Sequence, residues 1–432
     1  MQGKLNSFQK TMLQWNDMNP YNAVHVVRIS GLLDEGQLRL CLRSTLEGRG
    51  LTRLVLDPRK HCYAYLGGPT DCDVKVIAGE ANPVPVLQAE IERQINEPFA
   101  PAERINPFRF FAVTANESFF LGLAYFHPVA DAESIVSLLR GLVRAYQKQS
   151  QAASTIGMDL YPDHRAHLLR RHAAVVVSKV LALPEQARNL KQSHRPRYRD
   201  AQDSSIGFSL LSLGPDQLRR LLTAAKAWDL TVNDLLLAVL MKSVSPLSVG
   251  RASAGKRRRM SVVCIVNLRR ELGIDSARTF GLFLGSFTVT HTMQEGITLR
   301  ELAGDIRQQT LAIKQMQLYL ATPMELGLGR FLLRFFSPER RKKFYQKNYP
   351  LWGGLTNMNL NSLWGQSDDD RPLDYFRGVS TGPVTPLVFA VTTVGDRANV
   401  GLSYRLTVFS QEDIEKVRGH FTQLLEQLPE VA

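Results

Sequence analysis

The chain is 432 residues long, with 44% hydrophobic and 22% charged residues. This composition is typical of a globular protein, and the length gives a soft expectation of two or three domains around a sizeable core. It excludes a collagen-like or largely disordered chain and a small disulfide-stapled scaffold. The net charge of +13 favours anionic partners such as phosphates, acidic proteins or lipid headgroups.

The four cysteines form neither a CxxC pair nor a Cys/His grouping with zinc spacing. We therefore expect four reduced thiols and no metal site. The first residues lack the apolar core of a signal peptide, and no apolar run approaches the roughly 20 residues that span a bilayer. These features predict a cytoplasmic protein.

The first 150 residues predict an α/β lobe. A β-branched run indicates a strand over residues 22–30, and a helix follows that ends near residue 47. Residues 107–113 and 118–127 predict two paired strands. The second of these is apolar on both faces, which is typical of a strand buried within a sheet. A helix with an apolar stripe is expected at once after it, over about 131–147.

Residues 151–204 differ in composition, because they are rich in Arg and His and include one apolar helix at about 168–190. We interpret them as a basic helical connector. Residues 205–432 again alternate strands with helices, and the expected elements include strands 206–212, 261–267, 283–290, 387–394 and 399–404 and a final helix 411–427. The pattern predicts an α/β protein with two lobes of similar size, each a two-layer arrangement of sheet and helices.

The pattern HxxxD at the end of the buried strand carries the chemistry. His127 ends the strand and Asp131 opens the helix that follows. A histidine titrates near neutrality, so His127 could act as a general base toward a hydroxyl or amine that attacks an acyl carbonyl. Asp131 is better placed to anchor the loop. By itself the pattern is weak, since His127 could be a core histidine and Asp131 a helix N-cap.

At this point the sequence resembles the HxxxD acyltransferase superfamily, which includes condensation domains, polyketide-associated acyltransferases, wax ester synthases and chloramphenicol acetyltransferase. The resemblance covers nearly the whole chain and depends on the order of several short motifs. These motifs are Pro20-Tyr21-Asn22, Asn96-Glu97-Pro98-Phe99, Phe126 to Ala132, Thr231 to Asp234, Asn267-Leu268-Arg269 and Thr356-Asn357. It implies a chloramphenicol-acetyltransferase-like fold of two lobes that form a V around a central tunnel.

The resemblance also implies roles for individual residues. His127 would be the general base, and Asp131 would be a structural brace in an ion pair with Arg269. Asn357, or alternatively Thr356, is the candidate donor toward the developing oxyanion. The chain departs from the family pattern at Phe126, where the first His of HHxxxDG stands, and at Ala132 and Asn359, where relatives carry Gly.

The expected function is that of a stand-alone acyltransferase. It would move an acyl group from coenzyme A or a phosphopantetheinyl acyl-carrier protein to a hydroxyl or amine, with no tightly bound cofactor. The alternative is a catalytically degenerate scaffold recruited by carrier proteins or membranes. No nucleic-acid-binding signature accompanies the basic clusters.

Two stretches, the connector helix and residues 329–347, interleave apolar and basic residues. Residues 329–347 hold seven Lys/Arg against one acidic residue. Such stretches can lie on an anionic membrane surface, at the periphery of the inner face of the membrane. The alternative is a helix that packs between the lobes and exposes a solvated basic face.

Overall fold

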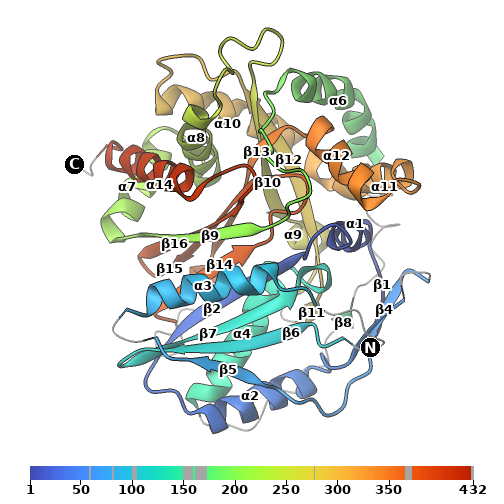
Figure 1. Cartoon of the computed structure of the whole chain (residues 1–432), viewed down its shortest axis with the longest axis vertical. Helices are drawn as coiled ribbons and strands as arrows, with labels where there is room; N and C mark the ends of the chain where they lie inside the picture. Colours follow the sequence, from blue (N-terminus) through green and yellow to red (C-terminus); the bar gives the residue numbers. More distant parts are fainter. Residues whose placement is uncertain are drawn as a thin grey trace.

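The computed structural model describes residues 1–57, 60–79, 82–99, 105–148, 159–160, 173–276, 278–364 and 372–429. The chain forms two lobes, the first drawn in blue to cyan and the second in green to red in Figure 1. Each lobe is built on a mixed sheet with helices against it. The predicted two-lobed α/β fold is confirmed.

The first lobe follows the sequence closely. Its elements are β1 (Gln2–Lys4), α1 (Ser7–Asn16), β2 (Asn22–Ser30), α2 (Glu35–Gly48), β3 (Leu54–Asp57), β4 (Cys62–Tyr65), β5 (Val74–Ile77), α3 (Pro83–Asn96), β6 (Phe108–Thr114), β7 (Ser118–Phe126), the 3-10 turn η1 (His127–Val129) and α4 (Ala132–Gln147).

The C-terminal segment, residues 205–432, holds more elements than the first lobe, and one of them, β14 (Asp374–Val379), joins the sheet of the first lobe. Its elements, with those of the connector, are β8 (Asp159–Leu160), α6 (Ala173–Gln192), β9 (Ile206–Leu213), α7 (Pro215–Ala227), α8 (Val232–Val244), η2 (Ser245–Leu247), β10 (Met260–Asn267), α9 (Arg269–Leu272), β11 (Thr279–Phe280), β12 (Leu284–His291), α10 (Leu299–Gln315), η3 (Leu318–Ala321), α11 (Thr322–Leu332), α12 (Pro338–Asn348), β13 (Leu351–Asn359), α13 (Asn361–Trp364), β14 (Asp374–Val379), β15 (Leu387–Val394), β16 (Arg397–Arg405) and α14 (Gln411–Glu426).

Strand β7 is buried along all nine of its residues. It lies in the middle of the five-stranded sheet β14-β2-β7-β6-β5. One face of this sheet packs against α2 and α4, through residues such as Leu121 and Leu138. The other face meets α3 and β9, where Phe120 joins a separate core cluster with Ile91 and Phe208. Both faces are therefore covered, which explains the unbroken apolar run in the sequence.

One strand of the C-terminal segment crosses to the first lobe. β14 pairs antiparallel with β2, so that Arg377 lies opposite His25. Trp364, just before it, belongs to the core of the first lobe. The expected segment 205–432 therefore does not form a self-contained lobe. The physical reason is that β2 would otherwise be an edge strand with unpaired backbone groups, and β14 satisfies them.

Helix α3 also joins the lobes, because its side chains cover the free edge of β9. Strand β9 is the last strand of the six-stranded sheet β12-β10-β13-β15-β16-β9. Its outward N–H groups belong to residues 206, 208 and 210, and they donate to Asn96 at 3.0 Å, to Glu92 at 2.8 Å and to Gln88 at 3.1 Å. Four helical residues rise about 6 Å and two strand residues about 7 Å, so the two spacings match.

The connector helix is present as α6, although residues 149–158 and 161–172 of this segment, including the first part of the expected helix, lie outside the described residues. Val175 of α6 packs on Leu320 and Ala321, and Lys179 pairs with Glu325 of α11 at 2.6 Å. The four cysteines are free thiols, as expected.

Within the described chain, no single helix has the length and apolar character needed to cross a bilayer. Among the described residues, helix α7 and residues 232–247 reach that length and apolar character only when taken together, and the two are bent by 111° at the break between them.

Candidate active site

His127 lies where β7 turns into η1. The β2–β7 ladder ends one residue before it, with Asn22 opposite Phe126, and the His127 N–H donates to the Tyr21 carbonyl at 3.1 Å. Pro128 ends the strand because it supplies no N–H for a ladder. The side chain is buried, with 7% of its surface exposed. The backbone of the turn is thus held by its continuation from β7 and by the hydrogen bond to Tyr21, directly before β2.

Hydrogen bonding fixes the tautomer of His127. Its Nδ1 lies 3.1 Å from the carbonyl oxygen of Ala130. A carbonyl only accepts, so Nδ1 carries the proton, and Nε2 of the neutral ring is left with its lone pair. The ring stacks on Tyr21, with centroids 5.5 Å apart and planes inclined by 9°, and meets the edge of Tyr125. This arrangement presents Nε2 as a base in a fixed orientation.

Burial lowers the pKa of His127 below its ordinary value of 6.5, because the protonated ring loses solvation. The hydrogen bond to Ala130 and the negative charge of Asp131 act in the opposite direction, and the positive charge of Arg377 lowers the pKa further. The ring is therefore neutral at pH 7, as a general base must be.

The carboxylate of Asp131 is bonded to the second lobe and holds the two lobes together. Its carboxylate accepts from Arg269 twice, at 2.9 Å from Nη2 and 3.2 Å from Nε, and both side chains are almost completely buried. It also accepts from the N–H of Ser134 at 2.9 Å and of Phe283 at 3.1 Å. The ion pair expected with Arg269 is present, and Asp131 is at the same time the N-cap of α4.

Ser134 and Gly281 extend this contact. The Ser134 hydroxyl accepts from Arg269 at 2.6 Å and donates to the Gly281 carbonyl at 2.9 Å, and the Asp131 N–H donates to the same carbonyl at 2.8 Å. Arg269 also donates to the Thr279 carbonyl at 3.1 Å. The start of α4, directly after the His127 turn, is therefore bonded to a segment of the second lobe.

Asn357 lies on β13, where its side-chain amide donates to Asn233 at 2.8 Å. Asn233 is in the first turn of α8, so two of the motif segments singled out in the sequence are in contact. Asn357 has a second N–H beyond this bond.

Sequence reasoning missed Arg377, which is fully buried on β14. Its guanidinium donates to the carbonyls of Val391 at 2.6 Å and Thr356 at 3.1 Å and to the Thr392 hydroxyl at 2.7 Å. Burial lowers its pKa to about 10, which leaves it charged at neutral pH. It lies next to Asn357 in the bonding network and its charge acts on His127. No local pattern in the sequence marks it, because β14 reaches the first lobe only through tertiary pairing.

The departures from the family pattern have simple structural consequences. Phe126 is buried and its ring lies 5.9 Å from that of Phe99, so an aromatic contact occupies the position of the first family histidine. Ala132 is the first helical residue of α4. Asn359 ends β13, and its side chain accepts from the N–H of Asn361 at 3.0 Å.

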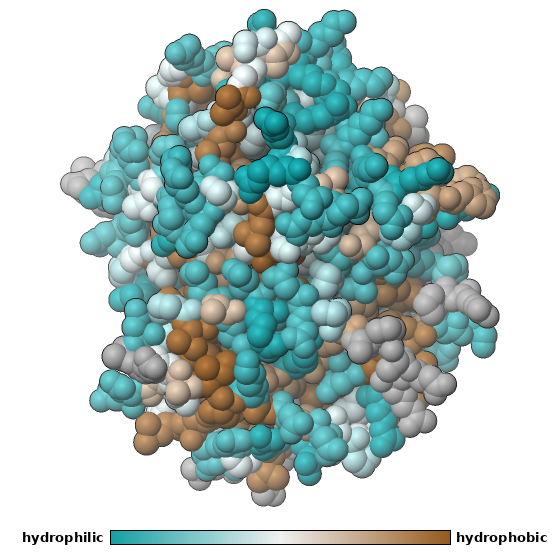
Figure 2. Space-filling model, in the orientation of Figure 1, coloured by the Kyte–Doolittle hydropathy of each residue, from teal (hydrophilic) through white to brown (hydrophobic). Residues whose placement is uncertain are grey.

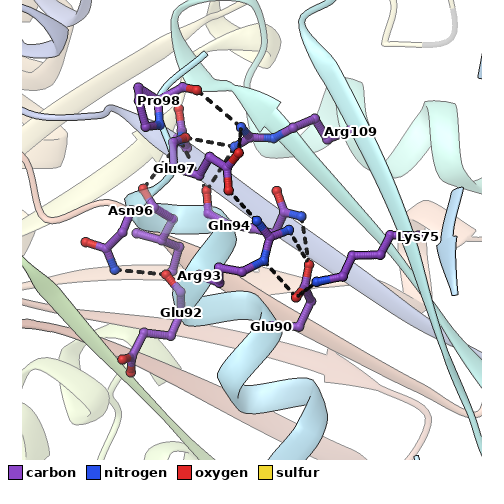
Figure 3. Close-up of polar contacts among 11 residues, drawn as sticks. Lys75, Glu90, Glu92, Arg93, Gln94, Asn96, Glu97, Pro98 and Arg109 are labelled. Atoms are coloured by element: carbon purple, nitrogen blue, oxygen red, sulfur yellow. Dashed lines mark hydrogen bonds and ion pairs between the residues drawn. The ribbon is translucent and has the colours of Figure 1, made fainter. Parts of the chain in front are cut away.

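A charged network joins α3 to β5 and β6, two strands of the sheet that contains β7 (Figure 3). Although burial opposes ionisation, hydrogen bonds from Arg93, Lys75 and Gln94 lower the pKa of Glu90 to about 2. Its carboxylate lies 2.7 Å from Arg93 and 2.9 Å from Lys75. The carboxylates of Glu90, Glu92 and Glu97 each accept from a cation or a backbone N–H, and we interpret the network as structural.

Arg109 completes that network at the end of α3. It donates to the carbonyls of Gln94 at 3.2 Å, Glu97 at 2.8 Å and Pro98 at 3.3 Å. Its guanidinium lies 4.1 Å above the ring of Phe99. Phe99 in turn contacts Phe126, so the Asn-Glu-Pro-Phe motif is fixed against the base of the His127 turn.

Among the described residues, no group of three or more His, Cys, Asp or Glu side chains is arranged to hold a metal ion.

Comparison with known proteins agrees with this geometry. The family model described as "Condensation domain" matches residues 3–325. A plipastatin synthase polypeptide of Bacillus subtilis (strain 168) is 25% identical over 232 residues, which are 51% of this chain and only 8% of that protein.

Solved structures show the same fold at low sequence identity. The first condensation domain of the calcium-dependent antibiotic synthetase is similar with a TM-score of 0.72 and 18% identity, covering 99% of this chain and 97% of that one. The condensation domain from the Monacolin K polyketide synthase MokA is similar with a TM-score of 0.68 and 11% identity, covering 99% and 98%. With its fold and three quarters of its length matched, the chain belongs to the condensation domain family.

Proposed function

We propose that this protein catalyses acyl transfer from a thioester of coenzyme A or of a carrier protein to a hydroxyl or amine, with His127 as general base. The observation that supports this most directly is the hydrogen bonding of the imidazole, which leaves Nε2 as its one acceptor atom. Nδ1 is held by Ala130, and Nε2 is neutral and oriented. Members of the condensation domain family generally form amides or esters, which is the same chemistry.

In the proposed reaction, the acceptor hydroxyl or amine gives its proton to Nε2 of His127 as its oxygen or nitrogen attacks the thioester carbonyl. The new C–O or C–N bond forms, and the C–S bond breaks as the tetrahedral intermediate collapses. The departing thiolate takes the proton from the imidazolium, which returns His127 to its starting state. No acyl-enzyme is required.

Asp131 has no part in proton transfer in this proposal. Its two oxygens accept four hydrogen bonds, two of them from the Arg269 cation. It positions the turn that carries His127. Asn357 is proposed to donate its second N–H to the developing oxyanion, supported by its link through Thr356 to Arg377, whose charge acts on His127.

The test is thiol release from acyl-CoA and acyl-carrier-protein donors in the presence of mixed amines and alcohols. We expect His127→Ala to lower turnover at least about a hundredfold, and His420→Ala on α14 to leave it unchanged. Asn357→Ala is expected to lower turnover about tenfold to a hundredfold if it serves the oxyanion. Undiminished turnover in His127→Ala would contradict the assignment. Absence of thiol release from the wild-type protein with every donor would favour the degenerate scaffold.

A further inference from the structure

Helix α11 exposes an apolar stripe on the side that faces away from the protein. Its inner side is made by residues such as Leu326 and Leu333, which pack near Trp15 of α1. Its outer side repeats large apolar residues at helical spacing and continues past the helix end, through Met324, Leu328, Phe331, Leu332 and Phe335. A helix that is apolar on both sides is unusual at a protein surface. We call this stripe the α11 face.

The exposure of the α11 face is large. Phe335 is 81% exposed, Leu328 and Leu332 are each 59% exposed, and Phe331 is 57% exposed. The apolar side chains project at the right edge of the molecule, where Figure 1 places the end of α11 and where Figure 2 shows pale-brown residues. They project from the surface, as a side chain that enters a lipid layer must.

The charges around the α11 face are almost all positive. Arg334 lies between the rings of Phe331 and Phe335, 4.3 Å and 4.4 Å from their centroids. Helix α12 follows at once with five more cations, of which Lys342 is buried, and Glu339 is the only acidic residue among residues 326–347. A projecting apolar stripe ringed by Arg and Lys complements the interface of an anionic bilayer, where rings enter the acyl boundary and cations meet the headgroups.

From this geometry we propose that the α11 face docks the protein on an anionic lipid membrane by inserting Phe331, Leu332 and Phe335. The proposal does not depend on the acyl-transfer function. The α11 face is connected to the candidate active site through helix α1. Helix α11 packs on α1, and Gln9 of α1 donates to the Pro128 carbonyl at 2.9 Å, next to His127. A membrane bound at the α11 face would therefore lie on the side of the protein where α1 contacts the His127 turn.

The experiment is vesicle flotation with the full chain. Vesicles of equal parts phosphatidylcholine and phosphatidylglycerol should capture the protein, and vesicles of phosphatidylcholine alone should capture far less. Raising the salt concentration should weaken capture. The double variant Phe331→Ser/Phe335→Ser should lower capture at least about tenfold, since each ring contributes apolar area to insertion.

A matched control is available because two other strongly exposed apolar side chains lie off this face. Leu32 is 76% exposed and Val249 is 85% exposed. Leu32→Ser/Val249→Ser should leave capture unchanged. Phe335→Trp provides a second measurement in a protein that keeps its apolar stripe, and its fluorescence should shift to the blue on adding the anionic vesicles.

Several results would overturn the proposal. Equal loss of capture in the control double variant would show that general hydrophobicity is responsible. Equal capture by neutral and anionic vesicles would show that the cations around the α11 face do not contribute to binding. A third contrary result is that the protein ignores anionic vesicles but binds an acidic carrier protein, or self-associates, and loses that binding in Phe331→Ser/Phe335→Ser. The face would then be a protein contact.

Discussion

Replacement of Asp131 tests whether the contact between Asp131 and Arg269 holds the His127 turn to the second lobe. Asp131→Asn keeps the size of the side chain and an oxygen for the N-cap bond to Ser134, but it removes the negative charge. Arg269 then remains as a cation with 3% of its side chain exposed and no carboxylate. Leaving one partner of a buried ion pair uncompensated costs about 3–5 kcal/mol of folding free energy.

Two further variants separate the contributions. Asp131→Ala also loses the N-cap, which adds about 1 kcal/mol, so we expect a total of about 4–6 kcal/mol. Combining it with Arg269→Met removes the orphaned cation, and most of the 3–5 kcal/mol assigned to it should return. The exposed pair of Asp216 and Arg219, also at a helix N-terminus, supplies the control, and Asp216→Asn should cost no more than about 1 kcal/mol.

The assay is urea unfolding followed by tryptophan fluorescence, with the midpoints compared at constant slope. Thiol release measured on the folded fraction should also fall in Asp131→Asn, because the His127 turn loses its anchor. If Asp131→Asn is no less stable than Asp216→Asn, the brace has no energetic role. If Asp131→Ala/Arg269→Met remains as unstable as Asp131→Ala, the unpaired cation is not the cause of the loss.

Three shorter predictions follow from other contacts. Because burial lowers the pKa of His127, the acid limb of the kcat/KM profile should lie below pH 6.5, and stability should fall as pH decreases through 6.5, where the unfolded chain takes up the proton first. An acid limb above pH 6.5 would contradict this. Arg377→Met removes a positive charge that lowers the pKa of His127, so the acid limb of the kcat/KM profile should move to higher pH. An acid limb that stays at the same pH would show that Arg377 does not influence His127. Asn96→Ala leaves the N–H and carbonyl of Ile206 unpaired and should cost about 1–3 kcal/mol in urea unfolding, whereas Asn348→Ala on the exposed part of α12 should cost little.

The local structure of the candidate site could be predicted from the sequence. The apolar run of β7, the proline after His127 and the carboxylate at the start of α4 are short-range signals, and they place His127 and Asp131 as the structure does. The partner of Asp131 lies 138 residues away, and only the family resemblance, not any local pattern, indicated Arg269. The tautomer of His127 and the stacking of Tyr21 required the coordinates.

The amino-acid pattern by itself indicated the strands and helices with clear periodicity, such as β7 and α4, and the turn that bears the imidazole, because periodicity and capping act over a few residues. It did not indicate β14. The tertiary structure alone decided that β14 returns to the first lobe and brings Arg377 into the charge environment of His127. It also decided that α3 covers the edge of β9. These choices depend on which sheet edges remain unpaired after the chain collapses, and neighbours in the sequence do not encode that.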